Sequence, residues 1–398
     1  MTGLILIATI SALLEDPLLP ERWREMALGF SRDKVVGSTE GTKADPQQES
    51  LRLLGEMIFH SNEISGEGER SCATCHDPDK AFQDRQSHPR GAQGIARDTP
   101  SLWGVGEQRW FGWDGRWDSL WAQALEPIEA KQEMDSDRLL LLRWIAADSE
   151  RKKLYESNFG KFPDMAGVPE RARKGEDWNP EFLRLPQKKQ QELNRAFSNA
   201  GRAVEAFERR LVPPRSAFDE YLEALASGDA EKAAQYPVDA RRGLIIFLDQ
   251  GRCVFCHNGP LFSDGEFHDT GLISAGSSAR DSGRYGGIME LRANPFNLLG
   301  DYSEDSQSTA ADRTRRLKRD SRMWGAFRTP GLRGVSQTAP YFHDGSRIDL
   351  GEVVRFYSRR QNARPVHQGA GHHGERLVEP LGLTPTEESL LEQFLKTL

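Results

Sequence analysis

Two short cysteine motifs constrain this chain more than any other feature of its sequence. The first is Cys72-Ala73-Thr74-Cys75-His76, and the second is Cys253-Val254-Phe255-Cys256-His257. The chain has 4 cysteines in all, so the two motifs use every one and none is left over for a disulfide. Two CxxCH motifs that account for all the cysteines indicate a shared chemistry rather than chance.

The CxxCH pattern is the attachment signature of c-type haem. Its two thiols form thioethers with the porphyrin, and the histidine that follows is held beneath the iron as a proximal ligand. The residues expected to bind two haems are therefore Cys72, Cys75, His76, Cys253, Cys256 and His257. The alternative is a zinc-binding or redox-active CxxC beside a chance histidine, and the doubled motif argues against it.

Composition limits the size of the fold and the kind of partner. A chain of 398 residues allows two to three domains, and 37 glycines with 21 prolines indicate long loops. The formal net charge is −7 and there is no long basic run, so we expect no nucleic-acid partner. An acidic protein attracts a basic one, such as a small cationic electron carrier.

The amino-terminal segment bears on location. Residues 3–14 form an apolar run that is too short to span a membrane and has no Lys or Arg before it. We interpret residues 1–20 as an export leader or a disordered start. Bacteria attach c-type haem on the outer side of the cytoplasmic membrane, so we expect a periplasmic protein.

Apolar periodicity predicts a mainly α fold. Helical spacing occurs at 47–59 and 239–249, each leading into one CxxCH motif. The stretch 186–226 predicts two helices separated by a break at Pro213-Pro214. Residues 160–185 and 274–318 have the composition of long loops, and the second is expected to be mobile.

Each motif with its flanking helices forms one expected domain. We predict two cytochrome c-like domains, one over 45–213 and one over 214–398, each enclosing one covalently bound haem. Long irregular loops complete both domains and wrap around the cofactors.

Several further motifs resemble the bacterial di-haem cytochrome c peroxidase and MauG family. The resemblance covers roughly residues 47–397, and it implies an oxidoreductase that uses hydrogen peroxide. The motifs that carry it are Arg97-Asp98-Thr99-Pro100-Ser101-Leu102, Trp113-Asp114-Gly115-Arg116, Gln123-Ala124, Pro127-Ile128, Glu133-Met134, Arg328-Thr329-Pro330-Gly331-Leu332-Arg333 and Thr338-Ala339-Pro340-Tyr341-Phe342-His343-Asp344-Gly345.

The resemblance implies that the first haem is the peroxidatic one. Glu133 matches the distal glutamate, which can take a proton from the near peroxide oxygen and return it to the far one. Gln123 matches a residue that orients peroxide, and Pro127 matches one that restricts the pocket without offering a ligand. Trp113 matches the aromatic residue between the haems, a relay for electrons or holes. Without the motifs, each of these would be an ordinary surface or core residue.

The second haem departs from the peroxidase pattern. Cytochrome c peroxidases have a methionine ligand fourteen residues after the histidine of the FHDG motif, but that count from His343 reaches Tyr357. MauG-like members have tyrosine at this position. An anionic oxygen ligand favours higher iron oxidation states, whereas methionine raises the potential. The alternative is that Tyr357 only packs in the domain.

Two more sites follow from the resemblance alone. Asp98 and the main-chain carbonyls of Thr338 and Pro340 match a calcium site between the domains, where family members usually have asparagine in place of Asp98. His88 lies in the loop where some members carry a histidine that gates the first haem, but it does not align with that position and reads as a surface residue.

Three functions are compatible with these features. The first is a peroxidase that reduces hydrogen peroxide with electrons from a small carrier, either a cytochrome or a cupredoxin. The second is a MauG-like enzyme that uses a high-valent iron state to oxidise a residue on a partner protein. The third is a non-enzymatic di-haem electron carrier or redox sensor. The resemblance favours the first and also implies a homodimer.

Overall fold

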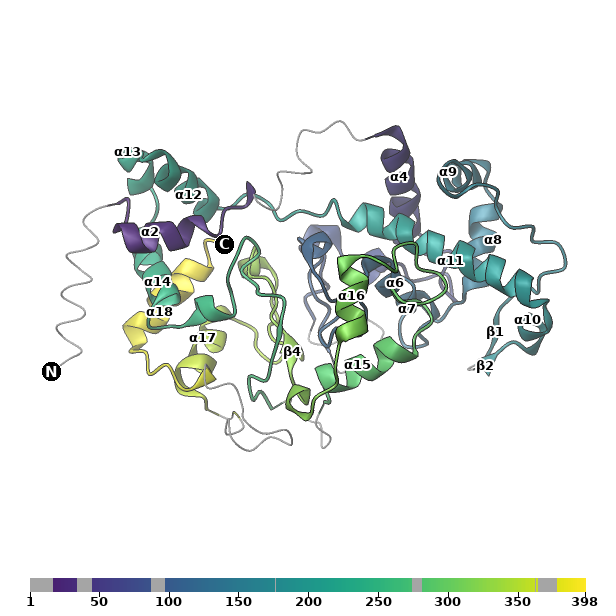
Figure 1. Cartoon of the computed structure of the whole chain (residues 1–398). Helices are drawn as coiled ribbons and strands as arrows, with labels where there is room; N and C mark the ends of the chain where they lie inside the picture. Colours follow the sequence, from purple (N-terminus) through teal and green to yellow (C-terminus); the bar gives the residue numbers. More distant parts are fainter. Residues whose placement is uncertain are drawn as a thin grey trace. The chain divides into compact units, whose positions relative to one another are not determined.

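The computed structural model describes residues 17–33, 45–86, 97–175, 177–273, 281–361, 363 and 378–398. The apolar run at 3–14 and His88 lie outside these residues. The chain forms two compact units (Figure 1). We call Gly41–Leu211 with Ser282–Asp320 the Cys72 unit, and Met1–Glu40 with Val212–Asp281 and Ser321–Leu398 the Cys253 unit.

The Cys72 unit is built from helices with one small antiparallel sheet, in which Arg173 lies opposite Trp178. Its elements are α4 (Pro46–His60), α5 (Cys72–Cys75), η1 (Pro78–Lys80), η2 (Val105–Glu107), α6 (Leu120–Gln123), α7 (Glu126–Glu129), α8 (Arg138–Ala146), α9 (Ser149–Phe159), β1 (Arg173–Lys174), β2 (Asp177–Trp178), α10 (Pro180–Arg184), α11 (Gln187–Glu208), α15 (Arg284–Ala293) and α16 (Thr309–Arg316).

Helix α4 precedes the first motif in the chain and crosses α11 at close range. The carboxylate of Asp45 caps α4 by accepting from the backbone N of Gln47 at 3.3 Å. A Cβ at Gly55 would lie only 1.8 Å from the carbonyl oxygen of Ala203, so the crossing requires glycine there. Leu54, together with the apolar face of the helix around it, is fully buried at this contact.

The Cys253 unit has the same plan, with a second two-residue sheet that pairs Phe267 with Arg328. Its elements are α2 (Glu21–Leu28), α12 (Ala217–Ser227), α13 (Ala230–Ala234), α14 (Val238–Leu248), η3 (Cys253–Phe255), β3 (Phe267–His268), η4 (Ser321–Met323), β4 (Phe327–Arg328), η5 (Val335–Gln337), α17 (Leu350–Arg359) and α18 (Pro385–Leu395).

Helices α14 and α18 form the corresponding crossing in this unit. A Cβ at Gly243 would lie 2.0 Å from the carbonyl oxygen of Leu390, so glycine again allows the close approach. Aromatic rings fill the core beside it, and Phe30 stacks on Phe262 with ring centroids 4.3 Å apart. In each unit, the CxxCH motif therefore follows a helix that crosses another helix at a glycine.

The helical predictions are largely confirmed. The expected helices at 47–59 and 239–249 correspond to α4 and α14, and α11 and α12 lie on either side of Pro213-Pro214. The prediction of a loop over 274–318 is wrong, because α15 and α16 fold within it. The polar composition and the paired glycines of this segment predict a loop, but tertiary contacts stabilise two helices in it.

The units do not follow sequence order in every segment. The main division falls between Leu211 and Val212, but Ser282–Asp320 folds with the Cys72 unit and residues 17–33 fold with the Cys253 unit. Within the described residues, no helix combines the length and apolar character needed to cross a membrane.

Candidate active site

The first CxxCH motif presents its ligands in the form that iron requires. Cys72 and Cys75 begin and end α5 as partly buried thiols that are not joined in a disulfide. The Nδ1 of His76 donates to the carbonyl oxygen of Phe82 at 3.0 Å, which leaves Nε2 available. Burial lowers the pKa of His76, although the Phe82 hydrogen bond opposes this shift. The imidazole is therefore neutral and can bind a metal.

The second motif repeats this arrangement. The Nδ1 of His257 donates to the carbonyl oxygen of Phe262 at 2.9 Å, and burial lowers the pKa of His257 as well. The thiols of Cys253 and Cys256 are free and partly buried. Both motifs therefore have two thiols and a histidine that a backbone carbonyl orients, so the residues present fit two covalently bound haems.

A longer frame also recurs in the two units at a spacing of 230 residues. Gly104 and Gly334 adopt φ 71° and 68°, while Gly115 and Gly345 adopt φ 65° and 61°. Each frame closes with one isolated antiparallel bridge. The bridged pairs are Phe111 with Trp117 and Tyr341 with Arg347. The short helices η2 and η5, and the starts of α6 and α17, keep the same spacing.

This repeat places Pro127 and Tyr357 at equivalent positions. In the Cys253 unit, α17 continues and carries Tyr357, whereas in the Cys72 unit the chain ends α6 and restarts with Pro127 in the first turn of α7. Proline offers no side-chain ligand and no backbone N–H. The position that holds a phenol in one unit is therefore left without a ligating side chain in the other.

Glu133 lies close to the first motif. A short backbone network holds its loop, in which Met134 N donates to the carbonyl of Pro127 at 3.1 Å and the Arg70 guanidinium donates to the carbonyl of Glu133. The Glu133 carboxylate is near enough to Cys72 to raise the pKa of that thiol, although burial is the main cause.

The carboxyl group of Glu133 changes its protonation state near neutral pH. Burial raises its pKa to about 7, the nearby Glu126 carboxylate adds to the rise, and Arg116 opposes it. Glu126 is itself fixed, because the indole Nε1 of Trp117 donates to its Oε2 at 3.0 Å. A carboxyl group in this state can both accept and return a proton at neutral pH.

Trp113 and Asp98 are joined directly. The indole Nε1 of Trp113 donates to the carbonyl oxygen of Asp98 at 2.8 Å. The buried Asp98 carboxylate accepts from the side-chain amide of Gln83 at 3.1 Å. This contact fixes the Trp113 ring within the Cys72 unit.

Tyr357 lies beside the second motif. Burial raises the pKa of its phenol well above the ordinary value, and the charge of Arg360 opposes that rise. The thiols of Cys253 and Cys256 interact electrostatically with the phenol, so all three groups share one environment. Cys256 also forms, with Asp264 and His268, a group whose possible metal ligands lie within 4.8 Å of one another. Attachment of a haem would remove Cys256 from that group.

The remaining predicted residues are Gln123, Asp98, Thr338 and Pro340. Gln123 is the last residue of α6 and is partly buried. Asp98 belongs to the Cys72 unit, whereas Thr338 and Pro340 belong to the Cys253 unit, so the calcium site stays a prediction. Sequence reasoning also missed the carbonyls that orient the histidines and the charged neighbours of Glu133. A backbone carbonyl leaves no residue-type signal, but the 230-residue repeat was readable in the sequence.

Comparison with known proteins agrees with this geometry. Residues 49–227 match the family model described as di-haem cytochrome c peroxidase. The cytochrome-c peroxidase IdrP2 of Pseudomonas sp. (strain SCT) is 29% identical over 349 residues, covering 87% of this chain and 80% of that protein. The methylamine utilization protein MauG of Methylorubrum extorquens is 27% identical over 377 residues, covering 94% and 85%.

Solved structures show the same fold. The diheme peroxidase BthA from Burkholderia thailandensis E264 aligns with TM-score 0.61 and 21% identity, covering 89% of this chain and 86% of that one. A MauG-like protein associated with microbial copper homeostasis aligns with TM-score 0.59 and 23% identity, covering 88% and 89%. The chain is therefore similar over most of its length to di-haem cytochrome c peroxidases and MauG proteins, and these relatives indicate a peroxidase-type oxidoreductase.

Proposed function

We propose that this protein reduces hydrogen peroxide to water with electrons from a small periplasmic electron-carrier protein. The observation that carries the proposal is a carboxyl group with a pKa near 7, Glu133, beside the first CxxCH motif. Pro127 occupies the position where the other unit carries a phenol. Peroxide reduction needs a group that exchanges protons, such as Glu133. It also needs an iron face that no side chain occupies, and Pro127 offers no ligand there.

The proposed chemistry divides between the cofactor and the chain. When bound, the haem supplies the iron at which peroxide is held and the route by which two electrons reach it. As a carboxylate, Glu133 takes the proton from the near oxygen of peroxide and gives it to the far oxygen, which leaves as water. Two electrons and two protons in total convert one hydrogen peroxide into two waters.

The neighbours of Glu133 have supporting roles in this proposal. Pro127 keeps the pocket free of a ligand and holds the Glu133 loop through its carbonyl. Gln123 orients peroxide by hydrogen bonding, and Trp113 relays electrons from a position fixed by the Asp98 carbonyl. Asp98 with the carbonyls of Thr338 and Pro340 would supply the hard oxygen donors that suit a calcium ion.

One observation favours a second candidate function. Tyr357 lies beside both cysteines of the second motif, and a phenolate there would bind the second iron in place of methionine. Such a ligand favours storage of oxidising equivalents over rapid electron entry. That property would suit a MauG-like enzyme that oxidises a residue on a partner protein.

The direct test combines peroxide turnover with a single substitution. Glu133→Gln should slow peroxide consumption by a reduced carrier by about a hundredfold or more, because the amide cannot accept the proton. Glu67→Gln is the matched control, since Glu67 is exposed in the same unit. A Glu133→Gln enzyme that turns over at the full rate would contradict the assignment. Oxidation of a partner residue without carrier turnover would favour the second candidate.

A further inference from the structure

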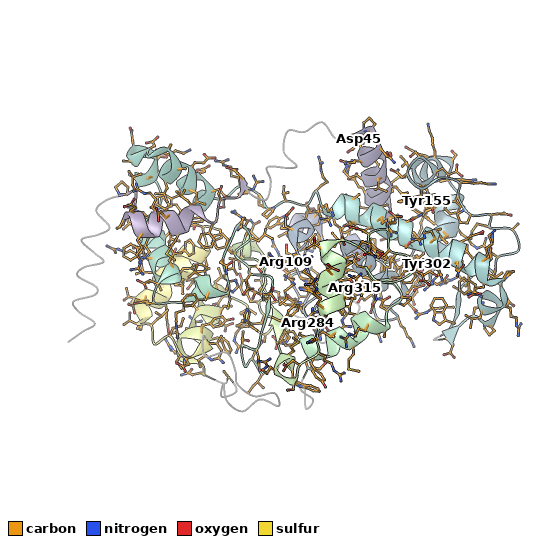
Figure 2. All side chains as sticks on the ribbon, in the orientation of Figure 1. Asp45, Arg109, Tyr155, Arg284, Tyr302 and Arg315 are labelled. Carbon is orange, nitrogen blue, oxygen red and sulfur yellow. The ribbon has the colours of Figure 1, made fainter. Side chains whose placement is uncertain are left out.

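The segment Ser282–Asp320 has seven basic and six acidic side chains, but five of the basic ones gather at 313–319, on a chain whose formal net charge is −7. The cations lie on α15, on α16 and on the residues just after α16, and Figure 2 labels Arg315 among them. We call this group the basic surface. It consists of the exposed residues Arg292, Arg313, Arg315, Arg316, Lys318 and Arg319.

Local contacts neutralise only part of this charge. Asp312 forms ion pairs with Arg315 and, at 3.9 Å, with Arg316. The guanidinium of Arg319 lies 4.5 Å from the centre of the Tyr285 ring. Exposed pairs of this kind are weak and leave the cations open to a partner. Arg316 keeps 82% of its side chain exposed.

Buried contacts make the basic surface a fixed platform. The hydroxyl of Thr314, on the inner face of α16, donates to the buried carboxylate of Asp118 at 2.9 Å. The buried Arg284 of α15 donates to the carbonyl of Gly115 at 2.5 Å and to that of Asp114 at 3.3 Å. Gly287 packs so closely that a Cβ there would lie 2.5 Å from the Asp114 carbonyl.

These contacts attach the basic surface to the stretch that follows Trp113. Asp114, Gly115 and Asp118 belong to that stretch, and they hold both helices. The Trp113 indole is itself fixed to the Asp98 carbonyl. A molecule bound on α15 and α16 would therefore lie over the part of the Cys72 unit that carries the proposed relay residue.

We propose that the basic surface binds an acidic electron-carrier protein, an inference that rests on the proposed function. Arginine is enriched at protein interfaces, and five of the six cations are arginines. Met289 and Leu299 on the same segment are 52% and 41% exposed and supply apolar contacts. The proposed carrier is thus acidic, whereas the net charge of the chain favours a basic one. Salt screens distant charges, so the charges of the local surface decide which partner binds.

The test measures carrier binding separately from catalysis. The holoenzyme is titrated calorimetrically with plastocyanin as an acidic carrier and with a basic mitochondrial cytochrome c, at 20 and 200 mM NaCl. The variant reverses three charges of the basic surface, Arg313→Glu, Arg316→Glu and Lys318→Glu. A control reverses three exposed lysines of the same unit, Lys152→Glu, Lys153→Glu and Lys188→Glu, so the net charge matches.

We expect the acidic carrier to bind at low salt. The Kd for this carrier should rise by roughly tenfold or more in the variant with three reversed charges on the basic surface, but not in the lysine control. Peroxide turnover with ferrocyanide should be unchanged in both variants. Equal loss of carrier binding in the two variants, or tighter binding of the basic cytochrome, overturns the inference while leaving the proposed function intact.

Two further arms complete the test. In the first, vesicles of phosphatidylglycerol and phosphatidylcholine replace the carrier. If the charge reversal weakens binding to vesicles but not to the carrier, the basic surface binds a membrane and the inference is overturned. If no donor supports peroxide turnover, the proposed function fails, and specific binding of the acidic carrier would then still support the docking surface alone.

Discussion

A buried glutamate beside the first motif provides a quantitative test of this structure. Glu208 is the last residue of α11, is 4% exposed and lies close enough to Cys72 to raise the pKa of that thiol. Its Oε2 has no hydrogen-bond partner among the residues that the structure describes. Burial raises the pKa of Glu208 from 4.5 to about 8, and the neighbouring Glu205 carboxylate adds to the rise.

The raised pKa lowers the stability of the fold as pH increases. Above pH 4.5 the unfolded chain loses this proton while the folded chain keeps it until about pH 8, so stability falls across that window and then levels off. Linkage at 1.36 kcal/mol for each pH unit gives a cost of about 1 kcal/mol at pH 5 and about 3 kcal/mol at pH 7. Glu208→Gln cannot ionise, so its stability relative to wild type should grow by about 2.5 kcal/mol over that range.

Guanidinium unfolding of the holoprotein at pH 5, 6 and 7 measures this difference. Any steric effect of the amide adds a constant at every pH, so the change with pH isolates the ionisation. Glu192→Gln, at an exposed position of the same helix, should give a difference that does not change with pH. A constant stability difference between Glu208→Gln and wild type from pH 5 to 7 would refute the reasoning.

Three other outcomes follow from the structure. The rate of the wild-type reaction with peroxide should rise about tenfold between pH 6 and 8, because the carboxylate of Glu133 is the active form and its pKa is about 7, and stopped-flow mixing should find no such rise in Glu133→Gln. Tyr357→Phe should change the electronic spectrum of the second haem and not of the first, and identical spectra would remove the phenol as a ligand. Asp118→Ala leaves the backbone N of Leu298 and the hydroxyl of Thr314 without their acceptor, so it should cost about 2–4 kcal/mol and speed hydrogen exchange in α16.

The sequence predicts the elements whose stability is local. Helices α4 and α14 have clear apolar periodicity, and the prolines between α11 and α12 end one helix and allow the next to begin. Helices α15 and α16 have no such local signal. They exist because Arg284, Gly287 and Thr314 contact residues about 170 to 200 positions earlier in the chain, and periodicity within a short window contains no information on such contacts.

The candidate site divides in the same way. The CxxCH residues are predictable because covalent attachment requires a fixed local spacing. The acid-base character of Glu133 is not, since its pKa depends on burial and on Glu126 and Arg116, which other parts of the chain supply. The sequence therefore predicts which groups could bind a cofactor, but not the electrical environment in which they work.

The difference between the two units rests on one position of a repeated frame. Both units hold a neutral histidine through a phenylalanine carbonyl, and both close the same bridged loop 230 residues apart. At the equivalent site, Tyr357 continues a helix and presents a phenol, whereas Pro127 interrupts the helix and uses its carbonyl to hold the Glu133 loop. A single backbone change thus replaces the phenol with a proline and places the proline carbonyl where it holds the Glu133 loop. Under the proposed function, this difference would give one architecture a reactive centre in one unit and an electron-storing centre in the other.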